Sequence, residues 1–279
     1  MENKRKKNKK GRRPPLLFLS LALIIIVVII LAVIKLLPKK EEKNYYKIQN
    51  RTDQVVSTSI EDDGVTYPAV GWLQIQGTDI DYPIVFNEEA NEYPATSDHY
   101  VWLSNLEVKF QKHIVLSGHN IFNLSNHPKI KDPLFTRFEE LMAFIYYDFA
   151  KGNKYIQLTM DGQEYVYKIF SVNLIPFDDT LFFPREYGYT EKEIYSYAKE
   201  LKETSLFDYN VKIDKNDNIL SLVTCTRFYG QDDRYEFRVL GRLVREGEKL
   251  DNYSVKKSNN YQKVENILKG DDNNEENNA

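Results

Sequence analysis

A chain of 279 residues can hold one domain of roughly 200 residues with its own hydrophobic core, flanked by shorter segments. The formal net charge of −3 conceals a strong asymmetry: residues 1–13 contain eight Lys or Arg and one Glu, whereas residues 250–279 are rich in Asn, Asp and Glu. The single cysteine, Cys225, excludes an internal disulfide framework and is therefore either an inert buried thiol or a reactive one.

The basic start is followed by an apolar segment at residues 16–37 that is interrupted only by Ser20 and Lys35. A helix of this length crosses a hydrocarbon core of roughly 30 Å. A cleaved signal peptide is the competing interpretation, but its apolar region would span only roughly 7–15 residues and end at a small-x-small site. We therefore predict a cytoplasmic basic segment at 1–15 and a single-pass anchor in the cell membrane at 16–37, with the rest of the chain outside the cell. Because the anchor tethers the basic segment to the bilayer, a nucleic-acid-binding arm is disfavoured.

Beyond the anchor, residues 38–64 are charged and polar with scattered aliphatics, which predicts an extracellular stalk with short helices. A compact folded domain is expected at 65–248, and a disordered polar tail is expected at 249–279. Aromatic and β-branched residues favour a mainly β barrel or sandwich with added helices. The predicted strands are 70–85 (two strands around a turn at Gly77), 112–117, 155–160, 164–174, 219–225 and 235–244, and the predicted helices are 133–144 and 191–204.

Cys225 ends the strand-like run 219–225, where a reactive thiol needs a neighbour that accepts its proton or stabilises its negative charge. His119 is the candidate partner, because it follows another predicted strand directly and Gly118 lets the backbone turn there. A surface loop histidine is the alternative interpretation of His119. The remaining histidines are predicted to lie in loops (His99 and His127) or half-buried within a strand (His113).

A cation or backbone N–H groups must also stabilise the oxyanion that forms when a thiolate adds to a carbonyl. The segment 234–244 alternates strictly, and antiparallel pairing with 219–225 would bring its first residue, Arg234, close to the thiol. Arg238 shares a face with Arg234, so alternation does not separate the two, and Arg227 is a third candidate. For each arginine, a solvated charged face is the alternative.

Three motifs in this order resemble the sortases, the membrane-anchored cysteine transpeptidases of Gram-positive bacteria. They are Gly118-His119-Asn120, Leu222-Val223-Thr224-Cys225 about a hundred residues later, and an arginine on the strand after that. The opening at 70–85 and the helical insertion containing 191–204 are more narrowly similar to class B sortases. The stretch 132–141 is similar to the pilus-associated branch of that class.

The resemblance implies an eight-stranded sortase-type β-barrel in which Cys225 cleaves a C-terminal sorting motif of a surface or pilin protein, forming an acyl-thioester. An amine of a cell-wall precursor or a pilin lysine would then resolve this intermediate. In this mechanism His119 acts as general acid and then as general base, and an arginine, assigned to Arg234, steadies the oxyanion. The mechanism needs neither a metal nor a cofactor.

Two other functions fit an exported domain with one cysteine. An exported cell-wall cysteine endopeptidase or papain-like hydrolase is the first, although such enzymes usually place the cysteine before the histidine, whereas His119 precedes Cys225. A non-catalytic anchored binding module, with Cys225 as a buried inert thiol, is the second.

Overall fold

The computed structural model describes residues 50–87, 98–105, 108–177, 189–231, 234–251 and 253–270. The chain divides into two units, Met1–Tyr45 and Tyr46–Ala279, and every described residue belongs to the second. The predicted basic segment at 1–15 and the predicted anchor at 16–37 thus lie outside the described residues. No helix within the described ranges is both long and apolar enough to cross a membrane.

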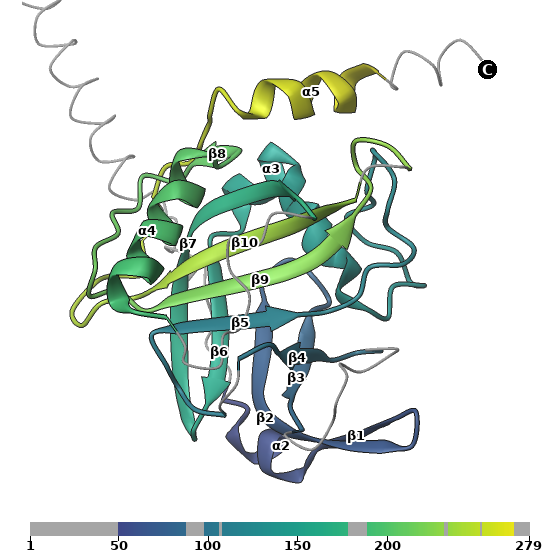
Figure 1. Cartoon of the computed structure of the whole chain (residues 1–279), viewed down its shortest axis with the longest axis vertical. Coiled ribbons are helices and arrows are strands. Elements are labelled where there is room, and N and C mark those ends of the chain that lie inside the picture. The colour runs from purple at the N-terminus through teal and green to yellow at the C-terminus, as the bar shows by residue number, and fades with distance from the viewer. Residues whose placement is uncertain are drawn as a thin grey trace, which may run out of the picture. The chain divides into compact units, whose positions relative to one another are not determined.

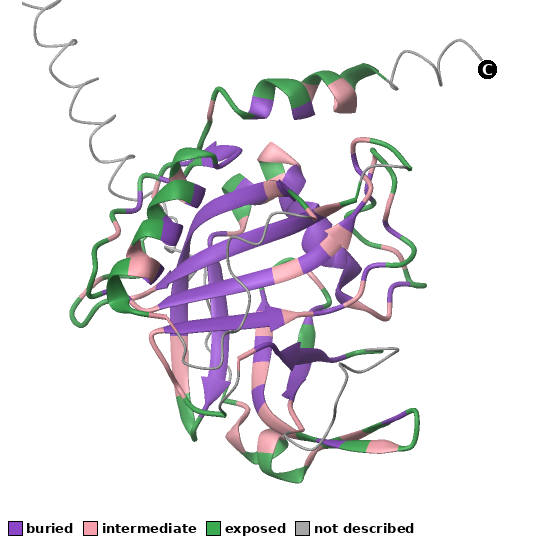
Figure 2. Ribbon diagram, in the orientation of Figure 1, coloured by how far each residue is buried: buried purple, intermediate pink, exposed green. Residues whose placement is uncertain are grey.

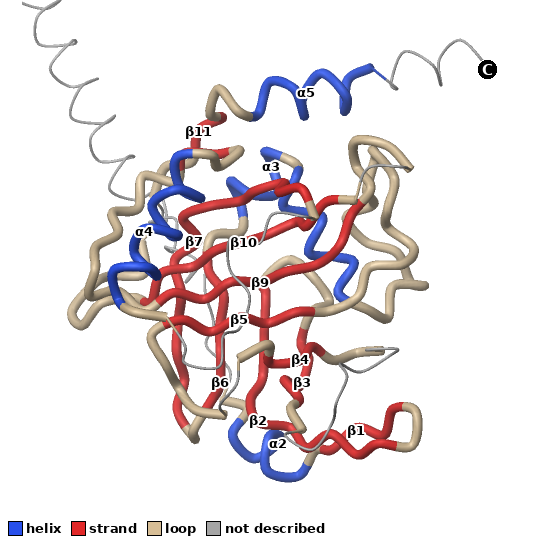
Figure 3. Tube along the Cα trace, in the orientation of Figure 1, coloured by secondary structure: helices blue, strands red, loops and turns tan. Residues whose placement is uncertain are grey.

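Eight strands close into a barrel at the centre of the second unit (Figures 1 and 3). The order around the barrel is β2-β3-β4-β5-β9-β10-β7-β6, and pairing of β6 with β2 closes it. Neighbouring strands are antiparallel except for β3 with β4 and β5 with β9. The strands are β2 (Val65–Ile75), β3 (Asp81–Val85), β4 (Val101–Leu103), β5 (His113–Ser117), β6 (Tyr155–Met160), β7 (Gln163–Pro176), β9 (Ile219–Thr226) and β10 (Tyr235–Leu243). The predicted eight-stranded, mainly β fold is confirmed.

The predicted strands lie where the alternation of apolar and polar residues places them. In β2, for example, Gly71, Leu73 and Ile75 are buried, and Trp72 and Gln74 between them are only half-buried. β4 was not predicted, because all three of its residues are buried and a strand this short shows no period-two pattern. Figure 2 shows the buried strands at the centre and the exposed faces of the helices at the periphery.

α4 (Glu191–Glu203) forms where the sequence predicts a helix. Its first turn is closed by a capping box in which Thr190 and Glu193 satisfy each other's backbone N–H groups. Its apolar face, spaced at helical intervals, is buried against the barrel and consists of Ile194, Tyr197, Ala198 and Leu201.

The helix predicted at 133–144 differs in the structure. The chain forms a loop up to residue 137, then the 3₁₀ helix η1 (Phe138–Ile145), followed by α3 (Tyr147–Gly152). Every residue of η1 is buried, including Glu139 and Glu140. Both carboxylates accept backbone N–H groups of other loops, which explains why this segment sits inside the fold despite its charge.

Part of the predicted stalk at 38–64 belongs to the folded domain. α2 (Thr52–Ser57) leads into β1 (Ser59–Asp62), which adds a ninth strand beside β2. The two-residue turn Asp63-Gly64 has positive φ at both positions, as a tight hairpin turn requires. The hairpin covers a second, small apolar cluster made of Tyr67, Val85, Tyr100 and Trp102.

The predicted disordered tail at 249–279 is also partly folded. β11 (Lys256–Lys257) pairs with β8 (Phe207–Asp208), and α5 (Tyr261–Gly270) follows. Tyr261 packs on Phe207 with ring centroids 4.8 Å apart, and Val264 is fully buried. The prediction was wrong for this stretch because a few apolar residues anchor it although its overall composition is polar; residues 271–279 lie outside the described part of the chain.

Candidate active site

Cys225 lies at the end of β9, where the strand leaves the barrel. Thr224 points into the protein and is buried, whereas Cys225, on the opposite face, is half-buried and carries a free thiol. The thiol lines a pocket of about 200 Å³. The described residues that line this pocket are His119, Asn120, Leu124, Phe177, Cys225, Thr226, Arg227, Arg234 and Tyr235.

Parallel pairing of β5 with β9 brings His119 to the same pocket, because both strands end at one edge of the barrel. The turn after β5 is fastened to β9 by two hydrogen bonds: the Gly118 N–H donates to the Val223 carbonyl at 3.2 Å, and the Thr224 hydroxyl donates to the Gly118 carbonyl at 2.8 Å. A Cβ atom at Gly118 would lie 2.6 Å from the Cβ of Phe138, so only glycine fits here.

Asn120, which follows His119, is buried and has a structural role. Its amide Nδ2 donates to the Cys225 carbonyl at 3.0 Å and to the Asn123 carbonyl at 3.1 Å. The Asn123 N–H donates back to Asn120 Oδ1 at 3.0 Å. The loop after His119 is therefore tied directly to the backbone of the cysteine.

Two residues that sequence reasoning missed support the histidine. The ring of Trp102 lies against that of His119, with centroids 4.8 Å apart at an angle of 55°. The buried Glu139 carboxylate accepts the backbone N–H groups of Ile121 and Phe122 at 3.2 and 3.0 Å, which holds the loop in place. Neither residue belongs to a sequence motif around His119. The one sequence signal for Glu139 is that an acidic side chain occurs there within a largely apolar run.

The structure places the three candidate arginines in different surroundings. Arg234 is exposed and lines the pocket, with its guanidinium carbon 4.2 Å from the ring centroid of Phe177. Arg227 also lines the pocket and donates to the Gln231 carbonyl. Arg238 is only 2% exposed and is not among the residues that line the pocket. The geometry thus brings Arg234 and Arg227 to Cys225 and His119, and leaves Arg238 beneath the surface.

The charges around Cys225 act in opposite directions. Burial raises the pKa of the thiol above its ordinary value, and the nearby Glu236 carboxylate raises it further. Arg234 and Arg227 lower the same pKa, because a positive charge favours the thiolate. A base is therefore needed to ionise the thiol at neutral pH, and the imidazole of His119, which lines the same pocket, is the candidate.

The other three histidines lie elsewhere. His113 is buried within β5, His99 packs against Tyr82, and the His127 ring nitrogen Nε2 is 3.0 Å from the Leu268 carbonyl. Among the described residues, no three His, Cys, Asp or Glu side chains are grouped in a way that could hold a metal ion.

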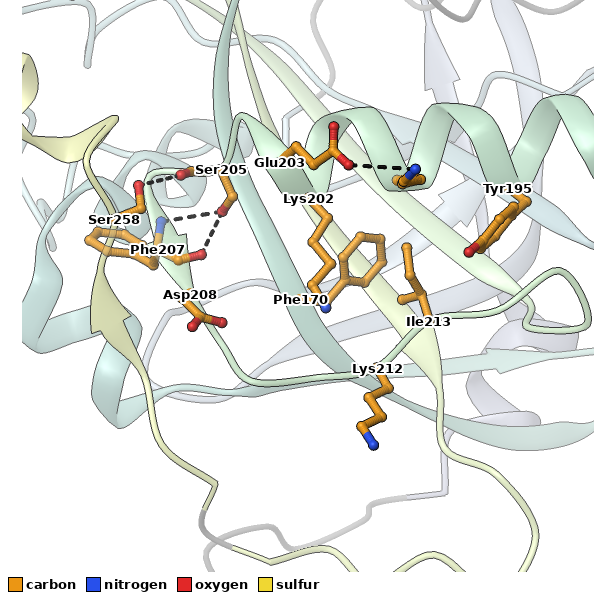
Figure 4. A pocket seen from close by; sticks show the side chains of 11 residues that line it. Phe170, Tyr195, Lys202, Glu203, Ser205, Phe207, Asp208, Lys212, Ile213 and Ser258 are labelled. Atoms are coloured by element: carbon orange, nitrogen blue, oxygen red, sulfur yellow. Dashed lines mark hydrogen bonds and ion pairs between the residues drawn. The ribbon is translucent and has the colours of Figure 1, made fainter.

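A larger pocket of about 580 Å³ lies beside α4 and β8 (Figure 4). In Figure 4 the Lys202 side chain extends alongside Phe170, and its ammonium donates to the Val211 carbonyl. None of the described residues that line this pocket is a histidine or a cysteine. It therefore holds no cysteine–histidine pair among its described lining residues, and the smaller pocket, which does, is the candidate active site.

Comparison with known proteins gives a consistent result. A family model for the sortase domain matches residues 73–244, a range that contains His119, Cys225 and Arg234. Sortase B of Listeria monocytogenes is 26% identical over 188 residues, which cover 64% of this chain and 68% of that protein. The structure of Clostridium perfringens sortase B is similar with a TM-score of 0.52 and 24% identity, covering 64% of this chain and 94% of that one.

The structure of sortase B from B. anthracis in complex with AAEK1 is similar with a TM-score of 0.50 and 18% identity, covering 70% of this chain and 94% of that one. At these identities the two solved structures support the fold, while the family match rests on the sequence of the barrel itself. Since that match spans more than half of the chain, the protein belongs to the sortase family of cysteine transpeptidases, and the relatives it resembles are class B sortases.

Proposed function

We propose that this sortase cleaves a C-terminal sorting motif of a surface or pilin protein and transfers the new acyl end to an amine. The amine comes from a cell-wall precursor or from a pilin lysine. One observation carries the proposal: a thiol, an imidazole and a guanidinium from distant parts of the chain line a single pocket at the edge of the barrel. These are the three groups that acyl transfer through a thioester requires.

In the first half-reaction the Cys225 thiolate adds to the carbonyl carbon of the scissile peptide bond. Protonated His119 gives its proton to the leaving amine as the C–N bond breaks, which leaves an acyl-thioester on Cys225. In the second half-reaction the incoming amine attacks the thioester and its proton passes to His119, while the Cys225 sulfur leaves. The nucleophile and the base are thereby returned to their starting protonation states.

Arg234 is the candidate for stabilising the negative oxygen of both tetrahedral intermediates. It lies in the pocket and is exposed, so its guanidinium can reach a bound carbonyl. Phe177 packs on this guanidinium, and the Phe177 N–H donates to the Arg234 carbonyl at 2.9 Å. Stacking of this kind orients the cation without neutralising it.

The decisive experiment offers the purified protein a peptide that carries a sorting motif, together with an amine such as a glycine oligomer or a lysine peptide. We expect an acyl-enzyme at Cys225 by mass spectrometry and an amide product that forms only when the amine is present. Cys225→Ala should abolish both, because it removes the nucleophile; cleavage that persists in Cys225→Ala would refute the assignment. A free carboxylate as the sole product, with or without amine, would instead identify a hydrolytic endopeptidase.

We further propose that residues 16–37 anchor the protein as a single membrane span, with 1–15 in the cytoplasm and the barrel outside the cell. The support is the apolar run and the basic residues that precede it. The full chain should stay in the membrane pellet after carbonate extraction, whereas a variant that lacks residues 1–45 should be soluble. Release of the full chain by carbonate would contradict the anchor.

A further inference from the structure

Glu236 lies directly opposite Cys225 in the antiparallel ladder of β9 and β10. Residues in directly opposed positions project to the same face of a sheet, with Cβ atoms about 4.5 to 5.5 Å apart. A carboxylate and the thiol are thus neighbours on one face. Glu236 is buried, at 6% exposure, and is not among the residues that line the pocket. It therefore lies beside the thiol within the protein and not in the pocket.

The Glu236 carboxylate is fixed in place by Arg238. The Arg238 Nε donates to Glu236 Oε2 at 2.8 Å, and Arg238 Nη2 donates to the same oxygen. Arg238 Nη1 donates to the Tyr197 hydroxyl of α4 at 3.0 Å. The carboxylate is therefore held in one orientation by a buried partner, beside Cys225.

We propose that Glu236 holds the resting Cys225 in its thiol form, so that ionisation depends on the cations and the base on the pocket side. Glu236 acts on the thiol through its charge and does not touch the substrate, which makes it a positioning residue. The inference rests on the proposed role of Cys225 as the nucleophile. Within the described part of the chain, the other charged or titratable groups around the thiol are His119, Arg227, Arg234 and Tyr235 in the pocket, and Arg238 and Tyr197 beneath it.

The balance of charges agrees with this placement. Glu236 raises the pKa of the Cys225 thiol, second only to burial, while Arg234 and Arg227 lower it. The carboxylate thus opposes the two pocket guanidinium groups. Removal of the Glu236 charge should favour the thiolate, because the other charges that act on the thiol, Arg234 and Arg227, both lower its pKa.

The test is the pH dependence of alkylation of Cys225 by iodoacetamide in the full chain, compared with Glu236→Gln. The amide keeps an oxygen that accepts from Arg238 and removes only the charge. We expect the midpoint of the profile to move to lower pH. The rate at pH 7 should rise roughly threefold, because the larger thiolate fraction is partly offset by the lower nucleophilicity of a more acidic thiol.

Glu248→Gln is the matched control. Glu248 also forms an ion pair with an arginine of β10, accepting from Arg242 at 2.6 Å, but near the other end of the strand. Its loss should leave the alkylation profile unchanged. An equal shift in both variants would show a general effect of lost charge and overturn the proposal.

Glu236→Gln leaves Arg238 without a full counter-charge and risks poor folding. The double variant Glu236→Gln/Arg238→Gln leaves no unpaired buried charge, and it should lower the midpoint as well. An unchanged midpoint in whichever variant folds, as judged by circular dichroism, would refute the role of Glu236. The measurement needs no transpeptidation, so its outcome is separate from cleavage in Cys225→Ala, which tests the nucleophile itself.

Discussion

Arg234 lies just before β10 and Arg238 lies within it, and their surroundings predict opposite consequences of mutation. Arg234→Ala removes the exposed pocket cation, and we expect kcat/KM to fall by a factor on the order of 10² to 10³. The free energy of unfolding of Arg234→Ala, measured in urea, should differ from the wild-type value by less than about 0.5 kcal/mol, as is usual for an exposed side chain.

Arg238→Ala should mainly destabilise the fold. It leaves the Glu236 carboxylate buried without its partner, which typically costs about 3 to 5 kcal/mol. Urea unfolding and peptide-transfer kinetics of the two variants separate the roles. If Arg238→Ala remained fully stable and lost more activity than Arg234→Ala, the two assignments would have to be exchanged.

At the level of residues, sequence reasoning reached Cys225 and His119 but not the choice between the arginines. The cysteine and histidine stand in short local motifs, next to predicted strand ends. The arginines share one alternating pattern, and a period of two assigns both to the same face. Only Glu236 and Tyr197, which come from the same strand and from α4, show that Arg238 is a buried structural residue.

α5 packs on the domain although the polar composition of the C-terminal segment does not suggest a folded element. The helix packs through Tyr261 and Val264, and Lys263 lies with its ammonium 3.9 Å from the ring centroid of Tyr229, in the loop after β9. The Tyr229 ring in turn lies 4.9 Å from that of Tyr235, which lines the pocket. The C-terminal helix therefore supports the loop that joins Cys225 to Arg234.

Val264→Ala should lower the free energy of unfolding by about 2 kcal/mol, because the side chain is fully buried and its loss leaves a cavity. Gln262→Ala, at an exposed position of the same helix, should change it by less than about 0.5 kcal/mol. Denaturant titrations of the two variants make the comparison. Equal stability of both would mean that α5 does not pack on the domain in solution.

Two physical causes explain the elements that differ from the prediction. β4 is too short and too buried to alternate, and η1 is buried on all sides, so neither shows the one-sided pattern of an amphipathic element. α5 has the pattern, but within a polar tail whose composition alone suggests disorder. α4 was predicted well because its cap and its apolar face are both local.

His113 couples the protonation of one side chain to the stability of the whole domain. It is buried in β5 with Nε2 2.8 Å from the Ser221 hydroxyl, and burial, helped by the charge of Arg238, lowers the pKa of His113 from 6.5 to about 3. Below pH 6.5, His113 binds a proton in the unfolded chain but stays neutral in the folded chain. Stability should therefore fall as the pH drops from 6.5 towards 3, by up to about 1.4 kcal/mol per pH unit from this group.

Urea unfolding at a series of pH values checks this expectation. The slope between pH 6.5 and 4 should be smaller in His113→Gln than in the wild type, whatever the absolute stability of the variant. His99→Gln, at an exposed position, should keep the wild-type slope. A slope in His113→Gln that equals the wild-type slope would show that the buried histidine does not control acid unfolding.

The sequence by itself predicted most strands of the barrel, α4, and Cys225 with His119 as candidate catalytic residues, because these depend on local periodicity and on short motifs that chain neighbours define. Only the tertiary structure decided that Arg238 stays outside the pocket that Arg234 and Arg227 line. It also decided that Trp102 and Glu139 hold the histidine loop, and that α5 belongs to the domain. These features arise where the parallel pairing of β5 with β9 and the closure of the barrel join residues far apart in the chain. Burial and charge at such junctions depend on partners that no local pattern encodes.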